Sequence, residues 1–300
     1  MRWSDRVYGE ASIDDPGILA VVGCPTFRRL LGIRQAGPSA FAFPFKTVTR
    51  YEHSVGVYLL LGRLGAGEKE QVAGLLHDIS HTAFSHAVDF VLTSQEQDHH
   101  EALKPEFLER GDMREALAGL GYQPSDFFDD SVYRLLERPL PWLCADRLDY
   151  FLRDGLTCGV INESSTARML GDLRVVEGTI AFAGEAIARE AAELFGVMNR
   201  DWWASATESY IYNEFADALR EGFRLGALRK KDLYEDDDYV LERLRSAKSA
   251  LIEEKLGRIM DFRVERTEEY APRVIPKTRW IDPPVMVGRT YRRLSELKKG

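Results

Sequence analysis

The sequence has few of the features that mark secreted or membrane-spanning proteins. Only three cysteines occur in 300 residues, at Cys24, Cys144 and Cys158, and they form neither a CxxC pair nor a disulfide framework. No apolar run approaches the roughly 18 residues that a membrane helix requires. The chain opens Met1-Arg2-Trp3-Ser4-Asp5 and continues into polar sequence, so we expect no secretory leader. These absences predict a protein of the reducing cytoplasm with no membrane contact.

An excess of positive charge is also missing. The chain carries 40 lysines and arginines against 48 aspartates and glutamates, a formal net charge of −8. Nonspecific binding to nucleic acid depends on a positive surface and is therefore not expected. A local basic cluster could still bind a phosphorylated small molecule. Apolar residues make up 45% of the chain, which is enough for a substantial core.

Helical patterns occupy most of the chain, and the predicted fold class is mainly α. Asp15 is expected to cap one helix and Thr49 the helix that carries His53. We further expect helical segments at 68–77, 84–92, 131–136, 185–227 and 239–260, and an extended stretch at 41–45.

Small β elements and a boundary complete the expected organisation. Residues 6–14 and 173–183 are typical of short hairpins, the second around Glu177-Gly178. A charged break follows Arg229. We therefore expect one domain over 1–230, with 231–300 forming an α+β C-terminal extension: a helix and an extended tail packed on that domain.

All six histidines lie between residues 49 and 101. Three of them stand beside acids or an arginine, in Arg50-Tyr51-Glu52-His53, His77-Asp78 and His99-His100-Glu101. Imidazole and carboxylate groups are the ligands that hard-to-borderline divalent metals accept. This clustering predicts a metal site held by helices.

A second polar group lies far along the chain, in the expected helix after Pro141. Its members recur at helical spacing and share one face: Asp146, Asp149, Tyr150, Arg153 and Asp154. Such a stripe could face solvent. The apolar residues on its other faces favour a packed helix with this polar face directed into a cavity.

A hydrolytic metal site needs three or four protein ligands, open positions, and outer groups that orient the ligands. His53, the adjacent pair His77-Asp78 and the distant Asp146 supply that number. Neighbouring side chains converge on one ion only where a helix ends, and His77-Asp78 lies at such an end. A metal held there would lower the pKa of water and polarise a phosphorus–oxygen bond.

This set resembles the HD superfamily of metal-dependent phosphohydrolases. Longer stretches are similar to its deoxynucleoside triphosphate triphosphohydrolase (SAMHD1-like) branch, and the likeness covers roughly residues 6–225. They are VYGEASID, FRRLLGIRQAG, RYEHSVGV, LLHDISHTAFSH, DHHE and ADRLDYFLRD. The resemblance implies an HD-domain helical bundle, a hydrolase, a nucleotide substrate and a divalent cofactor (Mn, Fe, Co, Ni, Zn or Mg). A homo-oligomer of two or more copies is also expected.

The resemblance also assigns roles to individual residues. It places the metal on His53, His77, Asp78 and Asp146. It makes His100 the proton donor to the leaving 5′-oxygen and Glu101 the acid that orients it, with His81 beside the α-phosphate. His86 either supports this shell or is a buried structural histidine.

Substrate contacts follow in the same way. The residues matched to phosphate are Arg50, Arg147, which replaces a lysine of the family, and Arg200. Those matched to the sugar are Gln35, Tyr150 and Asp154.

The chain departs from the family pattern in the stretch expected to hold the terminal phosphates. Ser205 and Ala206 stand where a Tyr-x-His-Lys motif supplies a histidine and a lysine, and Asp201 would repel a polyphosphate. Ala36 replaces a larger apolar residue near the sugar. These replacements predict retained metal hydrolysis with altered recognition of phosphate and sugar.

Several functions fit these observations. The first is hydrolysis of a dNTP, or a modified nucleoside triphosphate, with water attacking the α-phosphate. Alternatives are an HD nucleotidase or phosphomonoesterase, a phosphodiesterase, and a catalytically silent nucleotide-binding regulator. A diiron oxygenase on the same scaffold is more remote. The products formed, and the number of metal ions per chain, would separate them.

Overall fold

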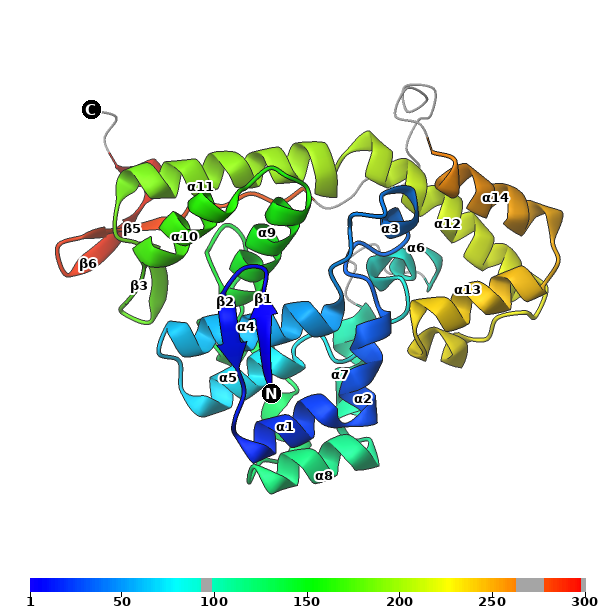
Figure 1. The fold of residues 1–300 in the computed structure, drawn as a ribbon, viewed down its shortest axis with the longest axis horizontal. Helices are drawn as coiled ribbons and strands as arrows, with labels where there is room; N and C mark the ends of the chain where they lie inside the picture. Colours follow the sequence, from blue (N-terminus) through cyan, green and yellow to red (C-terminus); the bar gives the residue numbers. More distant parts are fainter. Residues whose placement is uncertain (93–98, 263–277, 298–300) are drawn as a thin grey trace.

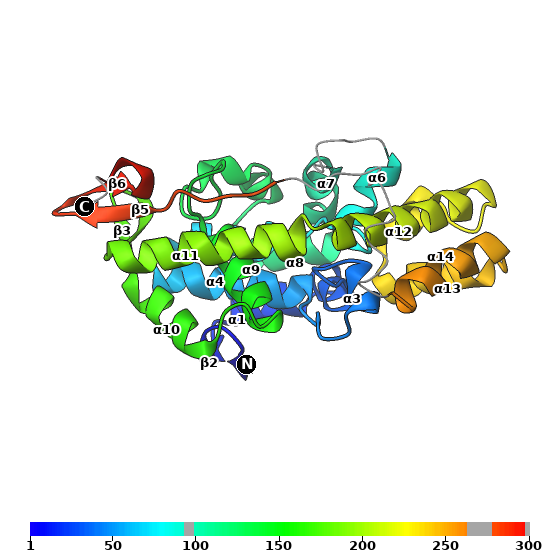
Figure 2. The same ribbon diagram turned by 90° about the horizontal axis from the view of Figure 1, so that it is seen from above.

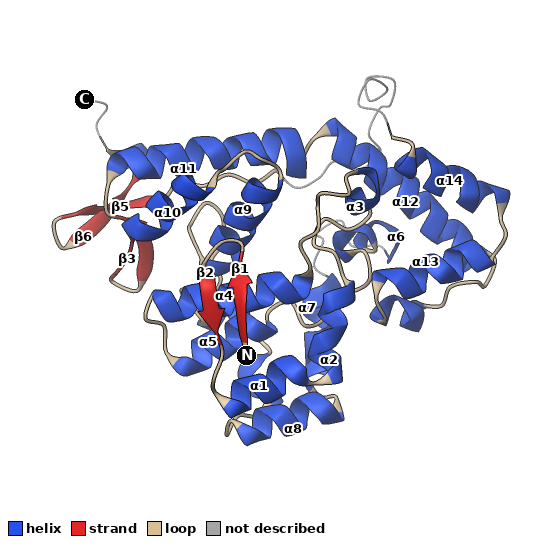
Figure 3. Ribbon diagram, viewed as in Figure 1, coloured by secondary structure: helices blue, strands red, loops and turns tan. Residues whose placement is uncertain are grey.

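The protein is seen in a computed structural model that describes residues 1–92, 99–262 and 278–297, apart from the side chains of 89, 92 and 99–101. Helices dominate it and the strands are short, which confirms the mainly α prediction (Figure 3). Among the described helices, none has both the length and the apolar character needed to cross a bilayer.

The α-helices follow one another along the whole chain. They are α1 (Pro16–Gly23), α2 (Pro25–Arg28), α3 (Ser39–Ala42), α4 (Arg50–Arg63), α5 (Glu68–Leu76), α6 (Asp89–Leu92), α7 (His99–Leu108), α8 (Gly111–Gly119), α9 (Ala145–Thr157), α10 (Glu163–Asp172), α11 (Glu185–Met198), α12 (Ala206–Arg224), α13 (Asp237–Ser246) and α14 (Ala250–Met260).

The strands form two small sheets. β1 (Arg2–Asp5) and β2 (Gly9–Ser12) make an N-terminal hairpin, whose first strand lies before the segment 6–14 in which a hairpin or turn was expected. The second sheet has the order β3-β4-β5-β6, from β3 (Leu173–Val176), β4 (Thr179–Phe182), β5 (Pro284–Val287) and β6 (Thr290–Arg293). Its first hairpin turns at Glu177-Gly178, as expected, and β5 lies parallel to β4.

Helices α4, α5 and α9 form the centre of the larger core, and α4 packs against both of the others. The Thr49 hydroxyl accepts a hydrogen bond from the Glu52 amide, and Asp15 caps α1, as the sequence predicted. Because α4 lies between α5 and α9, polar groups on its inner face meet the ends of both neighbours. The site is built at this junction.

A smaller core joins α12, α13 and α14 with the segment Ala83–Val88. Figures 1 and 2 show α11 and α12 running nearly end to end, with α13 and α14 at one extremity and the β3–β6 sheet at the other. The C-terminal portion therefore contacts both extremities of the molecule. The division at residue 230 stays a prediction.

Two long helices expected from the sequence are broken. The segment 185–227 contains α11, a π-helical turn at Asn199–Trp203, and α12, which begins where the Ser205 hydroxyl accepts from the Glu208 amide at 3.1 Å. The segment 239–260 divides into α13 and α14 at Lys248, whose φ is 49°. No glycine or proline marks that second break, so the apolar period alone could not indicate it.

Three shorter predictions were also wrong. Residues 39–42 are helical because Pro38 presets the first turn, although 41–45 was expected to be extended. The segment 84–92 starts with two residues of positive φ, and the single helix expected there is divided into a 3₁₀ turn at Ser85–Ala87 and the short helix α6. In 131–136 the helical part is a single 3₁₀ turn, Asp130–Val132.

Candidate active site

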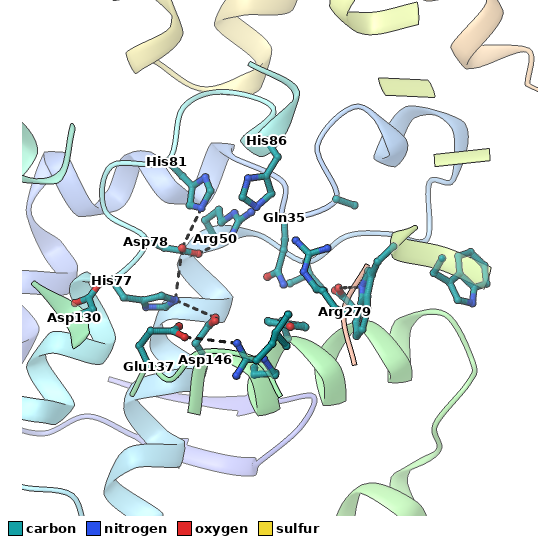
Figure 4. A pocket seen from close by; sticks show the side chains of 18 of the residues that line it. Gln35, Arg50, His77, Asp78, His81, His86, Asp130, Glu137, Asp146 and Arg279 are labelled. Carbon is teal, nitrogen blue, oxygen red and sulfur yellow. Dashed lines mark hydrogen bonds and ion pairs between the residues drawn. The ribbon is translucent and has the colours of Figure 1, made fainter. Parts of the chain in front are cut away.

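Four predicted metal ligands meet between α4, α5 and α9. The Nε2 atom of His53 lies 3.0 Å from Oδ1 of Asp146 and 3.1 Å from Nε2 of His77. Asp78 completes the group, with Oδ1 at 3.6 Å from His77 and Oδ2 at 3.8 Å from His53. Helix α5 ends at Leu76, so His77 and Asp78 turn toward the same point, as the predicted helix end requires (Figure 4).

The hydrogen bonds on the far side of each imidazole favour a cation at this point. His77 Nδ1 faces the Gly74 carbonyl at 2.7 Å and must donate to it. His53 Nδ1 faces Asp149 Oδ1 at 2.8 Å and donates to that carboxylate. Both Nε2 lone pairs are thus directed at one another and at two carboxylates. These four donors fit a divalent metal, which would relieve their mutual repulsion.

The electrostatics of the unliganded cluster agree with that fit. Burial lowers the pKa of His53, but the hydrogen bonds to Asp146 and Asp149 outweigh burial and raise the pKa to about 10. Without a metal ion, His53 therefore holds a proton at the position where the divalent cation would bind. His53, His77 and Asp146 also have ligand atoms close enough together to share one ion.

Asp149 is the outer group that orients His53. Its Oδ2 accepts from the Tyr8 hydroxyl at 2.7 Å, and its Oδ1 accepts from Arg153 Nε at 2.9 Å. Arg153 is fully buried and donates onward to Asp5 on β1 at 3.2 Å. The N-terminal hairpin therefore holds Asp149 from behind. Burial raises the pKa of Asp149, but Arg153 and His53 together lower it to about 2.

This arrangement divides the predicted polar stripe of α9. Asp146, Tyr150 and Asp154 line the cavity as expected. Asp149 and Arg153 point away from it and are fully buried in the network with the hairpin. Five side chains on one helical face cover too wide an arc for all of them to reach one cavity. Asp149 and Arg153, on one side of that arc, instead hold the ligand His53 and the hairpin in place.

A cavity of about 850 Å³ opens beside the ligands. Of the residues matched to substrate, those that line it are Gln35, Arg50, His81, Arg147, Tyr150 and Asp154. Arg200 does not line it: its exposed guanidinium pairs with Asp201. His100 and Glu101 belong to α7, and their side chains lie outside the described part of the structure.

Arg50 and His81 both approach Asp78 at one end of the cavity. Arg50 Nη1 donates to Asp78 Oδ2 at 2.7 Å, and His81 Nε2 lies 3.2 Å from Oδ1. The ring of His86 lies edge-on to that of His81, 5.0 Å away, and also lines the cavity. Burial, with help from Arg50 and Arg279, lowers the pKa of His86 to about 3. His86 is therefore neutral under ordinary conditions.

Of the acceptors that the sequence matched to the sugar, one lacks a hydrogen-bond partner among the described residues and another is already hydrogen-bonded. The buried Gln35 Oε1 has no hydrogen-bond partner among the described residues, so it can accept from a substrate hydroxyl. Asp154 instead accepts from Trp203 Nε1 at 2.9 Å. The Trp203 ring packs against Tyr150, with centroids 5.2 Å apart.

Sequence reasoning missed several lining residues because their neighbours are distant in the chain. The main ones are Lys46, Lys104, Glu137, Arg138, Trp202, Trp203, Glu208 and Arg279. Lys46 Nζ donates to Glu208 Oε2 at 3.1 Å, and Lys104 pairs with Asp130. Two adjacent tryptophans, Trp202 and Trp203, follow the charged pair Arg200-Asp201 in the sequence, and this pattern could have indicated that the stretch lines a binding cavity.

Comparison with known proteins adds the following. The HD domain family model matches residues 50–118. The Bacillus subtilis (strain 168) protein named uncharacterized protein YdhJ is 36% identical over 96% of this chain and 89% of its own length. Metal-dependent phosphohydrolase cns2 of Cordyceps militaris is 31% identical over 78% of this chain and 70% of its own length. The deoxynucleoside triphosphate triphosphohydrolase SAMHD1 homolog of Dictyostelium discoideum is 24% identical over 92% of this chain, which spans 62% of that protein.

Proposed function

The chain belongs to the HD-domain family of metal-dependent phosphohydrolases, and on that premise we propose that it removes a phosphate group from a nucleotide. The observation that carries the proposal is the convergence of two imidazole lone pairs and two carboxylates at one end of the cavity. His53, His77, Asp78 and Asp146 would hold the divalent ion. Such an ion supplies Lewis acidity toward water and toward a phosphoryl oxygen.

The protein's own groups then position the ester. Arg50 and His81 both contact Asp78, so a phosphoryl group next to the ligands would lie within their reach. Gln35 Oε1 would accept a hydrogen bond from a sugar hydroxyl. His100 as the proton donor to the leaving oxygen, with Glu101 orienting it, stays a prediction.

The charge of the cavity favours a short phosphate chain. Seven acidic and six basic side chains line it among the described residues. Lys46 and Lys104, the two lining lysines, are paired with Glu208 and Asp130. A triphosphate adds about four negative charges and a monophosphate about two, so the monophosphate needs less compensation. A nucleoside monophosphate is therefore the substrate that the geometry supports best.

A dNTP triphosphohydrolase is the second candidate. Similarity to the Dictyostelium protein supports it, since the alignment spans nearly the whole of this chain. In that case the terminal phosphates would be bound by the lining arginines Arg138, Arg147 and Arg279, or by a lysine that leaves its carboxylate partner.

A product assay decides between them. The purified protein is loaded with Mn²⁺ or Co²⁺ and given nucleoside mono-, di- and triphosphates with ribose or deoxyribose, and the products are separated by anion exchange. We expect orthophosphate from monophosphates. Release of intact triphosphate would favour the second candidate. Nucleotide binding without turnover under any metal would make the protein a regulator, and light scattering on the same sample would test the expected homo-oligomer.

A further inference from the structure

Asp237 is a buried acid that joins the C-terminal portion to the cavity. It is the first residue of α13 and is fully buried. Its Oδ2 accepts from the Arg34 amide at 2.9 Å, and its Oδ1 accepts from the Phe84 amide at 2.6 Å. Arg34 directly precedes Gln35, and Phe84 lies between His81 and His86. One carboxylate thus holds two segments that carry cavity residues.

The two residues that donate to Asp237, Arg34 and Phe84, lie outside the helices and strands. Phe84 and Ser85 have φ values of 60° and 51°, a region that costs free energy for residues other than glycine. The two segments also press together, because a Cβ on Gly37 would lie 2.6 Å from the Phe84 carbonyl oxygen. An acceptor from outside is needed for their amides, and Asp237 supplies it.

The contact continues from these segments to a metal ligand. The Ser85 hydroxyl donates to the Arg34 carbonyl at 2.9 Å and accepts from Arg50 Nε at 3.1 Å. Arg50 in turn donates to Asp78 at 2.7 Å. A shift of either segment would therefore move the guanidinium that faces the phosphate.

The same region packs firmly against α12 and also contacts the C-terminal portion. The Phe84 ring lies 4.2 Å from that of Phe215 on α12, between centroids. The Ala83 amide donates to the Leu233 carbonyl at 2.9 Å. These contacts already hold the Phe84 segment against its neighbours, so a buried carboxylate is not needed to keep the two parts together. Burial raises the pKa of Asp237 to about 7, which shows the cost of placing an acid there.

We propose that Asp237 is a positioning residue of the active site, and that it sets the Gln35 segment and the His81–His86 segment against Arg50. The C-terminal portion is then part of the phosphate-binding unit. The proposal rests on the proposed function only in that the same cavity takes phosphate, and its test uses phosphate binding rather than turnover.

The test compares Asp237→Asn with two controls. Asparagine keeps the volume but cannot accept from both amides. Glu242→Gln removes an exposed acid from the same helix, and Leu256→Ala weakens the same small core from α14 while leaving the Asp237 carboxylate in place. For each variant, calorimetry measures the affinity of the Mn²⁺-loaded protein for inorganic phosphate, and a thermal melt measures Tm.

We expect Asp237→Asn to weaken phosphate binding about tenfold, the effect of one lost hydrogen bond to a charged group. Mn²⁺ affinity should stay within about threefold, because the ligands themselves are unchanged. Leu256→Ala should lower Tm at least as much while keeping phosphate affinity. Unchanged phosphate binding in Asp237→Asn, or an equal loss in Leu256→Ala, would overturn the proposal. A failed nucleotide assay would leave this result intact and reject only the proposed function.

Discussion

The two ends of the cavity are built differently. At the metal end, His53 and His77 are each held from behind, by Asp149 and by the Gly74 carbonyl, and their lone pairs converge. At the opposite end, the charge of Lys46 is already neutralised by Glu208, and the Asp154 carboxylate already accepts a hydrogen bond from Trp203. The metal end is thus prepared for an ion, and the other end accepts little additional negative charge. We therefore expect substitutions at the metal end to change turnover and substitutions at the other end to change substrate choice.

The largest expected effect comes from the metal end. His77→Ala removes a ligand whose Nε2 lies at the convergence point, and should reduce turnover on the order of 10³-fold or more. Metal content by mass spectrometry should fall with activity while the circular dichroism of the fold is kept. Full activity in a metal-depleted His77→Ala protein would contradict the claim that the metal end of the cavity carries out the reaction.

The support behind His53 should matter somewhat less. Asp149→Asn introduces an amide that cannot accept from Arg153, Tyr8 and His53 together, so the imidazole loses its orientation. We expect Mn²⁺ or Co²⁺ affinity to fall about 10- to 100-fold in calorimetry. Glu193→Gln, an exposed change on α11, is the control. Equal metal affinity in both variants would contradict a role for the hairpin network.

A smaller effect is expected at the opposite end. Glu208→Gln leaves Lys46 without its carboxylate, so the cavity gains one positive charge. The ratio of kcat/KM for triphosphate to that for monophosphate should rise about fivefold, corresponding to roughly 1 kcal/mol. Glu221→Gln on the same helix removes an ion pair with exposed Arg224, away from the cavity, and should leave the ratio unchanged. An unchanged ratio in Glu208→Gln would show that the charge of the cavity does not decide how many phosphates the preferred substrate carries.

The last prediction concerns folding stability rather than turnover, and it depends on the titration of Asp237. Burial raises the folded-state pKa of Asp237 to about 7, from an ordinary value of about 4. Stability contributed by its protonated form is present below about pH 4 and is lost as the pH rises through 7. The hydrogen bonds from the Arg34 and Phe84 amides and the charge of Arg34 oppose this rise in pKa, and Asp236 adds to it.

Chemical denaturation of the wild type and Asp237→Asn from pH 5 to 8 checks this sign. The wild type should lose stability relative to the variant by on the order of 2 kcal/mol over that interval. A constant difference between the two proteins would show that Asp237 does not titrate there.

Local sequence was sufficient for the features that depend on neighbours in the chain. The Thr49 cap, the end of α5 before His77 and the hairpin at Glu177-Gly178 all follow from short-range rules, and each was predicted. The breaks at Lys248 and at Asn199–Trp203 were not predicted, because no glycine or proline lies at either of them.

The sequence by itself determined which residues could ligate a metal, since imidazole and carboxylate at the end of one helix and the start of another already specify that chemistry. Only the tertiary structure decided what surrounds them. Asp149 became a support rather than a lining residue, Arg200 stayed outside the cavity, and Glu208 and Asp237 entered from helices far along the chain. Side-chain type and helical spacing are local properties. The contacts between helix faces depend on how helices that are distant in the chain pack around α4, and these contacts cannot be deduced from a single sequence.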